Sequence, residues 1–507
     1  MATISLVSPL YWPPLVSALI IVITGYHVLA WALSTRKKLP PGPPRDPLIG
    51  HLRHLPQSQP AVVYTEWRKI YGDVIHLQAL SKSYLILGSE QAAVELLDQR
   101  SAIYSDRPRF VLYDIMGWGD ILSFLPYGKR HTRHRQQHHN LLARKSCPAF
   151  YPVQTREARK LVRNLLHTSG DQQHAALSRF STAIITDILT GHEIVSDDDY
   201  FVRLAEQLYE SFCVTGPPVR FFPDWIPGTY YARVAREWQD QVRDLYEYPV
   251  KYVQGAEANG TAQPSFLLSK LQNRGVSEEE EDLDLDELRA DALTIFVTGQ
   301  ATTSSILTVF LLAMVLYPES QRRAQEEILH VLGADQIPAY EDRAKLPFVE
   351  CVIQETLRWN PIVPLGVPHR LIQDDVYRGM LIPAGTTVYA NIRAMSRDES
   401  VYHDPEAFQP ERFLPRPEGR GEPRFASAFG FGRRLCTGNE LASNSIWIAA
   451  ATLLATCNIK NALDAAGRVI VPSTAMTDGI DCHPEHFPFA IEARSGLAAL
   501  LDDEMRL

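Results

Sequence analysis

The stretch "FGFGRRLCTG", residues 429–438, places one cysteine after two arginines in a glycine-rich loop near the end of the chain. Its glycines let the backbone curl tightly around Cys436, while cationic neighbours and backbone N–H groups stabilise the thiolate form of a cysteine. Residues 439–455 then predict a helix whose N-terminus points at the sulfur. The stretch therefore predicts a site for a sulfur-ligated metal at Cys436.

The bulk composition limits the classes of protein to which the chain can belong. It has 507 residues, of which 45% are hydrophobic, so it can form a substantial globular core. A net charge of -9 gives no overall basic field, which argues against nucleic acid as a partner. The cysteines lie at wide spacings without a CxxC pair: Cys147, Cys213, Cys351, Cys436, Cys457 and Cys482. This spacing argues against a disulfide framework or a zinc site and is typical of a reducing compartment.

The N-terminal segment differs in kind from the rest of the chain. Residues 15–33, LVSALIIVITGYHVLAWAL, carry no formal charge and are long enough to cross a hydrocarbon core as a helix. Arg36, Lys37 and Lys38 follow, which is the reverse of the charge order in a cleaved signal peptide. We therefore expect residues 1–38 to form a retained membrane anchor, with the rest of the chain in the cytosol. A buried core helix is the alternative.

The anchor is followed by residues 39–47, LPPGPPRDP. Because proline fixes the backbone and removes a donor, this segment predicts a stiff hinge between the anchor and a body of residues 48–507. A proline-rich ligand for another protein is the alternative.

Helical periodicity dominates the body. Residues 318–333 have apolar and charged faces at helical spacing, and Gly333 can end that helix. Residues 347–361 predict a second helix, which must stop before Pro361. Short β signals, enough for small sheets only, occur at 74–80, 83–88 and 386–391. No internal repeat or second linker divides the body, so we predict one large domain, mainly α with small β-sheets.

The spacing of the cysteine loop also carries a family resemblance. Its pattern FxxGxRxCxG is formed by Phe429, Gly432, Arg434, Cys436 and Gly438. In this pattern the chain resembles the cytochrome P-450 superfamily, whose fold is a single large haem domain. The resemblance implies that Cys436 is the thiolate ligand of haem iron, where its electron density favours O–O cleavage.

Two further motifs belong to the same resemblance. Glu355 and Arg358 form an ExxR pair whose spacing puts both side chains on one helical face. Arg412, in PERF, is similar to the third member of that network, which in the family locks the segment leading to the cysteine loop. The order of these motifs before Cys436 is that of the family.

The haem propionates need cationic or proton-donating partners. Residues 125–139 lie where the family has Trp-x-x-x-Arg, and here His131 and Arg135 take those positions. A histidine can still donate a hydrogen bond from a ring nitrogen. The resemblance adds His369 and Arg434, so these four side chains are the predicted propionate partners.

Residues 296–305, FVTGQATTSS, lie where the family has (A/G)Gx(D/E)T in a helix over the haem. Gly299 and Thr302 match that motif, whereas Thr298 replaces the small residue and Ala301 the acid. In the family the glycine opens a groove for O2, and the threonine hydroxyl takes part in a proton relay with water. Without the acid, we expect the relay to depend on Gln300, Thr302 and water.

The resemblance also implies a redox partner, because no GxGxxG motif for a flavin or nicotinamide follows a strand. The partner expected is a membrane-bound reductase that takes electrons from NADPH and presents an acidic face. A local basic patch could dock it, and its predicted members are Lys129, Arg130, Arg133, His138 and Arg433.

By analogy with the family, the substrate pocket is apolar. Its predicted lining comes from residues 105–124, residues 213–230, Thr298, Ile362 to Leu365 including Val363, and the turn around Gly479. Such a lining favours a lipophilic terpenoid or polyketide.

Three functions remain open on the sequence. The leading one is a monooxygenase of the endoplasmic reticulum membrane that inserts one atom of O2 into a secondary metabolite. A haem-thiolate isomerase or dehydratase that needs neither O2 nor a reductase is kept open by Ala301. A membrane haem sensor is the third.

Overall fold

The computed structural model describes residues 39–213, 231–273 and 284–494, together with five positions between residues 17 and 25. The predicted anchor therefore lies mostly outside the described residues, and so do residues 214–230 of the predicted pocket lining. The helices are α2 (Pro60–Tyr71), α3 (Glu90–Ala93), α4 (Ser101–Tyr104), α5 (Val111–Met116), α6 (Lys129–Leu142), α7 (Tyr151–His167), α8 (Asp171–Thr190), α9 (Tyr200–Cys213), α10 (Tyr231–Ala258), α11 (Phe266–Gln272), α12 (Leu285–Leu316), α13 (Pro318–Leu332), α14 (Pro347–Trp359), α15 (Ile392–Ser396) and α16 (Asn439–Thr456). Short helical turns are η1 (Leu52–His54), η2 (Val94–Asp98), η3 (Trp118–Asp120), η4 (Cys147–Phe150), η5 (Tyr340–Lys345), η6 (Pro410–Phe413), η7 (Ala426–Phe429) and η8 (Gly432–Arg434).

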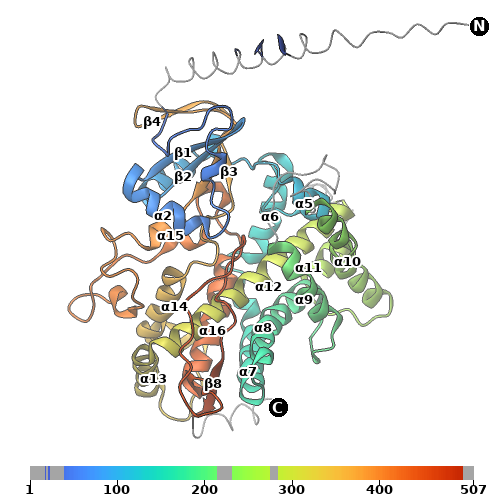
Figure 1. Cartoon of the computed structure of the whole chain (residues 1–507). Coiled ribbons are helices and arrows are strands. Elements are labelled where there is room, and N and C mark those ends of the chain that lie inside the picture. Colours follow the sequence, from blue (N-terminus) through green and yellow to red (C-terminus); the bar gives the residue numbers. More distant parts are fainter. Residues whose placement is uncertain are drawn as a thin grey trace, which may run out of the picture.

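The strands form three small sheets. They are β1 (Val74–Ala79), β2 (Lys82–Leu87), β3 (His369–Arg370), β4 (Asp375–Tyr377), β5 (Met380–Ile382), β6 (Thr387–Ala390), β7 (Cys457–Asn461) and β8 (Phe489–Ala493). The largest sheet has the order β1-β2-β6-β3, in which β2 and β6 are parallel and the other pairs antiparallel. The pairs β4-β5 and β7-β8 are antiparallel. Figure 1 shows the largest sheet with α2 at one end of the molecule and the long helices filling the rest.

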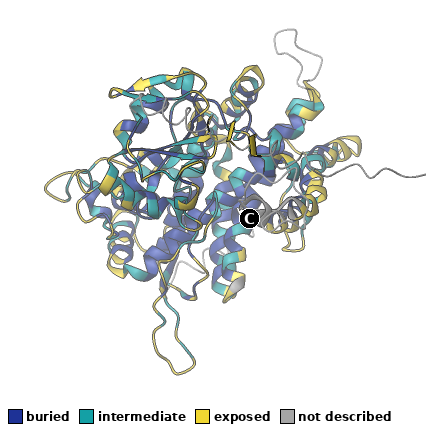
Figure 2. Ribbon diagram, turned by 45° about the horizontal axis from the view of Figure 1, so that its top comes forward, coloured by how far each residue is buried: buried dark blue, intermediate teal, exposed yellow. Residues whose placement is uncertain are grey.

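Helix α12 is the centre of the helical part. It packs against α6, α8, α10, α14 and α16, and Figure 1 shows it crossing the molecule between them. Its length and hydropathy would suit a membrane span, but most of its apolar window is buried inside the protein. Figure 2 shows the buried residues concentrated in these central helices. The hydropathy of α12 is therefore that of a core helix.

The sequence-based prediction of a mainly helical fold with small sheets is confirmed. Helix α13 ends where Gly333, at φ +89°, donates its N–H to the carbonyl of Leu329. Helix α14 ends at Trp359, two residues before Pro361, as the restriction on residues before proline requires. The three predicted strands are β1, β2 and β6.

The proline-rich segment 39–47 packs on the sheet. The carbonyl of Pro41 accepts the N–H of His76 in β1 at 2.8 Å, and that of Pro43 accepts Nε2–H of His51 at 2.8 Å. A Cβ on Gly42 would lie 2.2 Å from the carbonyl oxygen of His76, so only glycine allows this approach. The proline-rich segment is therefore held against the sheet as well as being stiff.

Glu355 joins α14 to the segment that leads to the cysteine loop. Arg358 donates to its two oxygens at 2.7 and 2.8 Å, and Arg412 donates Nε–H at 3.0 Å. All three side chains are fully buried, and Glu422 pairs with Arg412 at 2.7 Å. Two arginines and two glutamates make the group neutral, so each charge is offset by another.

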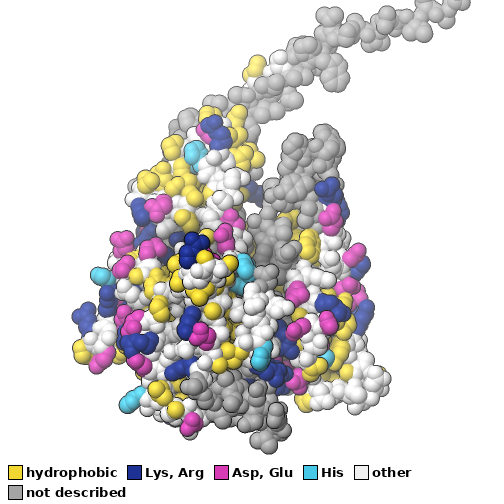
Figure 3. Space-filling model, turned by 60° about the horizontal axis from the view of Figure 1, so that its bottom comes forward, with side chains coloured by type: hydrophobic (Ala, Val, Ile, Leu, Met, Phe, Trp, Pro, Cys, Tyr) yellow, Lys and Arg dark blue, Asp and Glu magenta, His cyan; other side chains and the backbone are white. Residues whose placement is uncertain are grey.

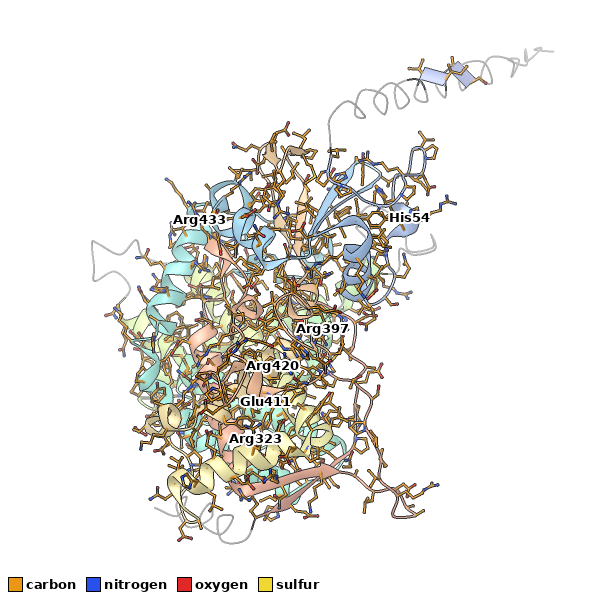
Figure 4. The ribbon with its side chains drawn as sticks, turned by 90° about the vertical axis from the view of Figure 1, so that its left-hand side faces the viewer. His54, Arg323, Arg397, Glu411, Arg420 and Arg433 are labelled. Carbon is orange, nitrogen blue, oxygen red and sulfur yellow. The ribbon has the colours of Figure 1, made fainter. Side chains whose placement is uncertain are left out.

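The arginines also bind the segment through its backbone. Arg358 donates to the carbonyls of Ser396, Pro405 and Ala407, and Arg412 to those of His403, Asp404 and Ala407. Figure 4 shows Arg397, Arg420, Glu411 and Arg323 following one another down the side of the molecule that this segment covers. The network therefore fixes the path of the chain before the cysteine loop.

Substitution Glu355→Gln should destabilise the fold by about 3–5 kcal/mol, because it leaves two buried guanidinium groups with one carboxylate. Urea unfolding measures the effect. Glu326→Gln on α13 is the matched control, since Glu326 pairs with Arg322 in solvent and should cost under about 1 kcal/mol. Equal costs for the two variants would contradict the role of burial.

Acid should weaken the packing around β1. Burial, followed by Arg45 and His51, lowers the pKa of His76 to about 4, well below the usual value for histidine. The unfolded chain therefore binds this proton first as the pH falls below about 6.5, so stability falls from there toward pH 4.

The expected loss for His76 is about 2 kcal/mol between pH 7.5 and pH 5. Unfolding in urea at the two pH values measures it, and His76→Phe should remove that part of the pH dependence. His330→Phe, at an exposed position on α13, should keep the slope of the unmodified chain. A slope unchanged by His76→Phe would show that other groups cause it.

Candidate haem-thiolate site

The cysteine loop is shaped by glycines and by the start of α16. Cys436 donates its N–H to the carbonyl of Phe429 at 2.9 Å, which closes the loop. Gly432 has φ +54°, and a Cβ there would lie 2.2 Å from the carbonyl oxygen of Leu97. Gly438 precedes α16, and a Cβ on it would lie 3.9 Å from Sγ of Cys436. Phe429 and Gly438 line the cavity beside the sulfur, whereas Gly432 packs against the backbone of Leu97.

Cys436 lines an internal cavity, and its side chain is accessible from that space. Burial raises the pKa of its thiol, while the backbone N–H of Gly438 and the guanidinium of Arg135 act in the opposite direction. The two opposing groups are the positive charge and helix-start donor expected around a ligating sulfur. A metal cation at the sulfur would remove the proton outright.

One wall of the cavity is strongly cationic. The predicted partners Arg135, His131, His369 and Arg434 all line it, and Arg107 joins them. Backbone carbonyls hold the guanidinium groups in place. Arg434 donates to those of Ser105, Leu122 and Leu125, Arg107 to those of Ser123, Val367 and Pro368, and Arg135 to that of Leu435. The wall is therefore rigid as well as charged.

The positive charges of this wall lower one another's pKa values. Burial, and then the charge of Arg434, lowers the pKa of Arg107 well below its usual range. Burial lowers the pKa of Arg434 to about 10, with Arg135 adding to the effect and Asp106 opposing it. Cations gathered in this way are stabilised by an anionic group placed between them.

The two histidines of this wall are neutral. Burial, followed by the charges of Arg434 and Arg135, lowers the pKa of His131 to about 3, and its Nδ1 is buried without a partner among the described residues. Burial and then Arg107 lower the pKa of His369, whose Nδ1–H donates to the carbonyl of Tyr104 at 2.8 Å. An anion between the cationic groups would supply the missing partner of His131.

The donor set therefore fits a haem. One thiolate-forming cysteine faces the cavity, and beside it stand three guanidinium groups and two imidazoles for a pair of carboxylates. Arg107 lies in the range 105–124 predicted to line the pocket, but the sequence motifs did not name it as a propionate partner, because nothing in residues 105–110 separates it from a surface arginine. Only the long-range contact with residues 367 and 368 reveals its position.

Helix α12 forms another part of the cavity wall. Thr294, Thr298 and Thr302 line the cavity, each donating its hydroxyl to the carbonyl four residues earlier at 2.7 to 2.8 Å. Their spacing puts them on one helical face, with the remaining lone pairs of each Oγ1 open to other donors. The structure thus places Thr302 and Thr298 in the same cavity as Cys436.

Gly299 and Gln300 face other elements. A Cβ on Gly299 would lie 2.6 Å from Cδ1 of Ile185 in α8, so the glycine permits close packing of α8 on α12. Gln300 is buried and donates Nε2–H to Oγ of Ser178 at 2.8 Å. It lies two residues from Thr302, which turns its side chain to the far side of the helix. The cavity lining does not include Gln300, in contrast to its predicted place in the relay.

Of the other residues predicted to line the pocket, some line the cavity and others do not. Ile362 and Val363 line the cavity, as do Leu122 and Phe124 of the range 105–124. Leu365 does not, because the turn closed by Gly366 N–H on the Val363 carbonyl directs it toward the small cluster under the largest sheet. Ile480 and Asp481, just after Gly479, line the cavity, and Asp481 accepts a hydrogen bond from Ser305 Oγ at 3.0 Å.

A buried cluster at the α6–α12 contact corrects one prediction. His138 was expected in an exposed basic patch, yet it is buried and binds Asp291 of α12 through Nε2 at 2.9 Å. His134 binds the same Asp291 oxygen through Nδ1 at 2.6 Å. Burial opposes the ionised form of Asp291, but these two hydrogen bonds outweigh it, so the pKa of Asp291 is lowered. Helical spacing on α6 puts His131, His134 and His138 on one inward face.

The remaining members of the patch are partly neutralised. Arg130 pairs with Asp120 at 2.6 Å and Arg133 with Glu287 at 2.7 Å. Lys129 and Arg433 are exposed, and Arg433 donates to the hydroxyl of Tyr127 at 2.6 Å. Figure 4 shows Arg433 near the edge of the molecule, away from the labelled residues Arg397 and Arg420. The face drawn in Figure 3 carries basic and acidic side chains intermixed.

Comparisons with known proteins agree with this geometry. The family model for cytochrome P-450 matches residues 40–467. Cytochrome P-450 monooxygenase 176 of Postia placenta (strain ATCC 44394 / Madison 698-R) is 38% identical over 488 residues, covering 92% of each chain. Tryptamine 4-monooxygenase of Psilocybe cyanescens is 35% identical over 473 residues, covering 89% of this chain and 92% of that one.

A solved structure shares the fold. A zebra fish cytochrome P-450, determined with abiraterone, has a TM-score of 0.71 at 22% identity and covers 86% of this chain and 100% of its own. The names of the relatives imply an oxidoreductase, and the family and fold imply a haem. With a family model over most of its length and relatives above 30% identity, this chain belongs to the cytochrome P-450 family.

Proposed function

We propose that the protein is a haem-thiolate monooxygenase that inserts one atom of O2 into a lipophilic small molecule, with electrons from NADPH delivered by a reductase. The observation that carries the proposal is the cavity itself. Cys436 lines it together with a group of cationic side chains, and Thr298 and Thr302 of α12 line the same cavity.

In this site Cys436 would ligate the iron of a non-covalently held haem b, whose iron supplies the O2 chemistry. Arg107, Arg135 and Arg434 would hold its two propionates, with His131 and His369 as further partners. The closed carbonyl contacts of the arginines keep these groups oriented and help to exclude water from that wall.

Protons have to reach the cavity from residues other than position 301, because Ala301 offers no acid. Ser305 lies one helical turn after Ala301 on the same side of α12 and donates Oγ–H to Oδ2 of Asp481 at 3.0 Å. Among the described residues that line the cavity, Asp481 is the acidic one. We therefore assign to Asp481 and Ser305 the proton-relay role that the acid at position 301 has in the family motif. Oγ1 of Thr302 would orient the water that ends the relay in the cavity.

The lining suggests the substrate class. Leu122, Phe124, Ile184, Ile362 and Val363 make the distal part apolar, which suits a terpenoid or polyketide. One relative is named for its action on tryptamine, so an aromatic amine belongs among the candidates.

The proposal places the protein in the endoplasmic reticulum membrane. The apolar run 15–33 and the basic residues 36–38 support a single span with the body in the cytosol. An NADPH-dependent reductase in the same membrane would dock on the exposed cations Lys129 and Arg433.

Labelled oxygen tests the function. With NADPH, reductase and a candidate substrate under ¹⁸O2, one heavy oxygen atom should appear in the product. Thr302→Ala should keep haem and substrate binding but divert most of the reductant to hydrogen peroxide, because the water is no longer oriented. Product formed without O2 and NADPH would instead establish an isomerase or dehydratase, and haem binding without any turnover would favour a sensor.

A rescue experiment tests the part assigned to Asp481. Asp481→Asn should lower the product formed per NADPH about ten-fold with little change in haem content or unfolding midpoint, and Ala301→Asp in the same chain should restore much of it. Asp478→Asn removes an exposed charge from the same loop and should leave the ratio unchanged. Loss of stability without rescue would show that Asp481 only holds the loop to α12.

A further inference from the structure

Two histidines share one buried carboxylate where α6 packs against α12. Oδ1 of Asp291 binds Nδ1 of His134 at 2.6 Å and Nε2 of His138 at 2.9 Å, and all three side chains are buried. The other carboxylate oxygen, Oδ2, and Nε2 of His134 are buried without a hydrogen bond among the described residues. We call these three side chains the Asp291 cluster. Neither the sequence motifs nor the proposed proton relay uses it.

His138 connects the Asp291 cluster to the cavity that Cys436 lines. Its ring is part of the cavity lining, as are the cations Arg135 and Arg434. Nε2 of His138 is held by Asp291, and Nδ1 has no hydrogen-bond partner among the described residues. A carboxylate that binds one ring nitrogen fixes the tautomer and the orientation of an imidazole. Asp291 is therefore a positioning residue for His138, whose ring is the part of the cluster closest to any charge in the cavity.

The charge of the cluster can change by one proton. A lone negative charge is unfavourable in a fully buried position, whereas a proton on either imidazole makes the cluster neutral. Both rings bind the same oxygen, so this proton has two alternative positions. Burial opposes the ionised form of Asp291, but the two imidazoles outweigh it and lower the pKa of the carboxyl. The carboxylate therefore keeps its charge, and the imidazoles exchange the proton.

Solvent lies within one helical turn of the cluster. Glu287 is four residues before Asp291 on the same face of α12, and it pairs with Arg133 of α6 at 2.7 Å. The side chain of Glu287 is 18% exposed. A proton that passes between solvent and the cluster therefore crosses only one turn of α12.

Other charges around this contact belong to the cavity wall or to separate ion pairs. The wall contributes Arg107, Arg135, Arg434 and the neutral rings of His131 and His369. The ion pairs on elements around α6 and α12 are Arg130–Asp120, Arg156–Asp187, Arg179–Asp197, Arg243–Asp240, Lys251–Glu247, Arg358–Glu355 and Arg144–Glu440. Burial and the two imidazoles have the largest effects on the pKa of Asp291, so the separate ion pairs contribute less.

Resting on the haem of the proposed function, we propose that the Asp291 cluster is a redox-linked proton site, which takes up a proton from solvent when an electron enters the bound haem. The external reductant supplies the electron, which adds a negative charge in the cavity. The proton forms an N–H bond on His138 or His134 and offsets that charge. Because monooxygenation consumes protons as well as electrons, the cluster would bring both into the protein together.

The pH dependence of the haem midpoint potential tests the site. Potentiometric titration of the full-length holoprotein, without O2 or substrate, should show a potential that falls as the pH rises through the range in which histidines titrate. Uptake of one proton per electron corresponds to a ten-fold change in the reduction equilibrium per pH unit, or about 59 mV. We expect a change of at least about three-fold per pH unit, or about 28 mV.

Two variants and a matched control assign this dependence to the cluster. Asp291→Asn keeps an acceptor for the imidazoles but removes the charge that stabilises the proton, so most of the pH dependence should disappear. His138→Gln removes the titrating ring at the cavity and should have the same effect. His139→Gln, at an exposed position on α6, should keep the dependence of the unmodified protein. The haem spectrum of each variant is recorded to confirm that the site is intact.

The outcomes separate the proton site from the haem site. A normal haem-thiolate spectrum with a potential that does not change with pH would overturn the proton site and leave the proposed function standing. Full pH dependence in both Asp291→Asn and His138→Gln would assign the proton to the propionates or to other histidines, which also overturns the proposal. A protein without haem, or without the spectrum of a thiolate-ligated haem, would reject the proposed function and this inference with it.

Discussion

The course of the chain from α14 to the cysteine loop depends on one shared carboxylate, that of Glu355. Glu355 binds Arg358 of its own helix and Arg412 from 57 positions further along the chain, and no water reaches the contacts. A buried ion pair contributes little on balance, since desolvation offsets attraction, but a group that lacks one member is strongly unfavourable. The network therefore contributes little net stability, and its main effect is to fix the course of the backbone. It admits one course of the chain before Cys436, and the position of the sulfur follows from that course.

The same logic explains how a chain of net charge -9 contains a cationic wall. Arg107 and Arg434 direct their N–H groups at backbone carbonyls, which offer partial negative charge without an acidic side chain. The carbonyls hold the guanidinium planes, and Asp106 offsets only part of the positive charge of this wall. The hydroxyls of Thr294, Thr298 and Thr302, which line the cavity from α12, donate within their own helix. The cavity therefore has one charged wall and one nearly neutral wall.

How much of the site could be predicted from the sequence depends on how far apart in the chain the interacting residues lie. Cys436 and its glycines lie in ten consecutive residues, so spacing alone revealed them, and the ends of α13 and α14 follow from Gly333 and Pro361. Helical geometry could also have shown that Gln300 and Thr302, two residues apart, cannot share a face. Arg107 and Asp481 are different, since the contacts with Val367 and Ser305 that place them join residues more than 150 positions apart, and no local pattern marks them. His138 was misplaced for the same reason, because its partner Asp291 is on another helix.

Helix α12 shows why hydropathy alone cannot distinguish a core helix from a membrane span. Several of its polar side chains have a partner on a different element. Asp291 binds α6, Thr294 accepts the N–H of Leu122, Gln300 binds α8, and Ser305 binds the loop after Gly479. Lipid could provide none of these partners, so the polar groups require a protein environment. Residues 15–33 carry few such groups and no formal charge, and this difference in the need for partners separates the two segments despite their similar apolar character.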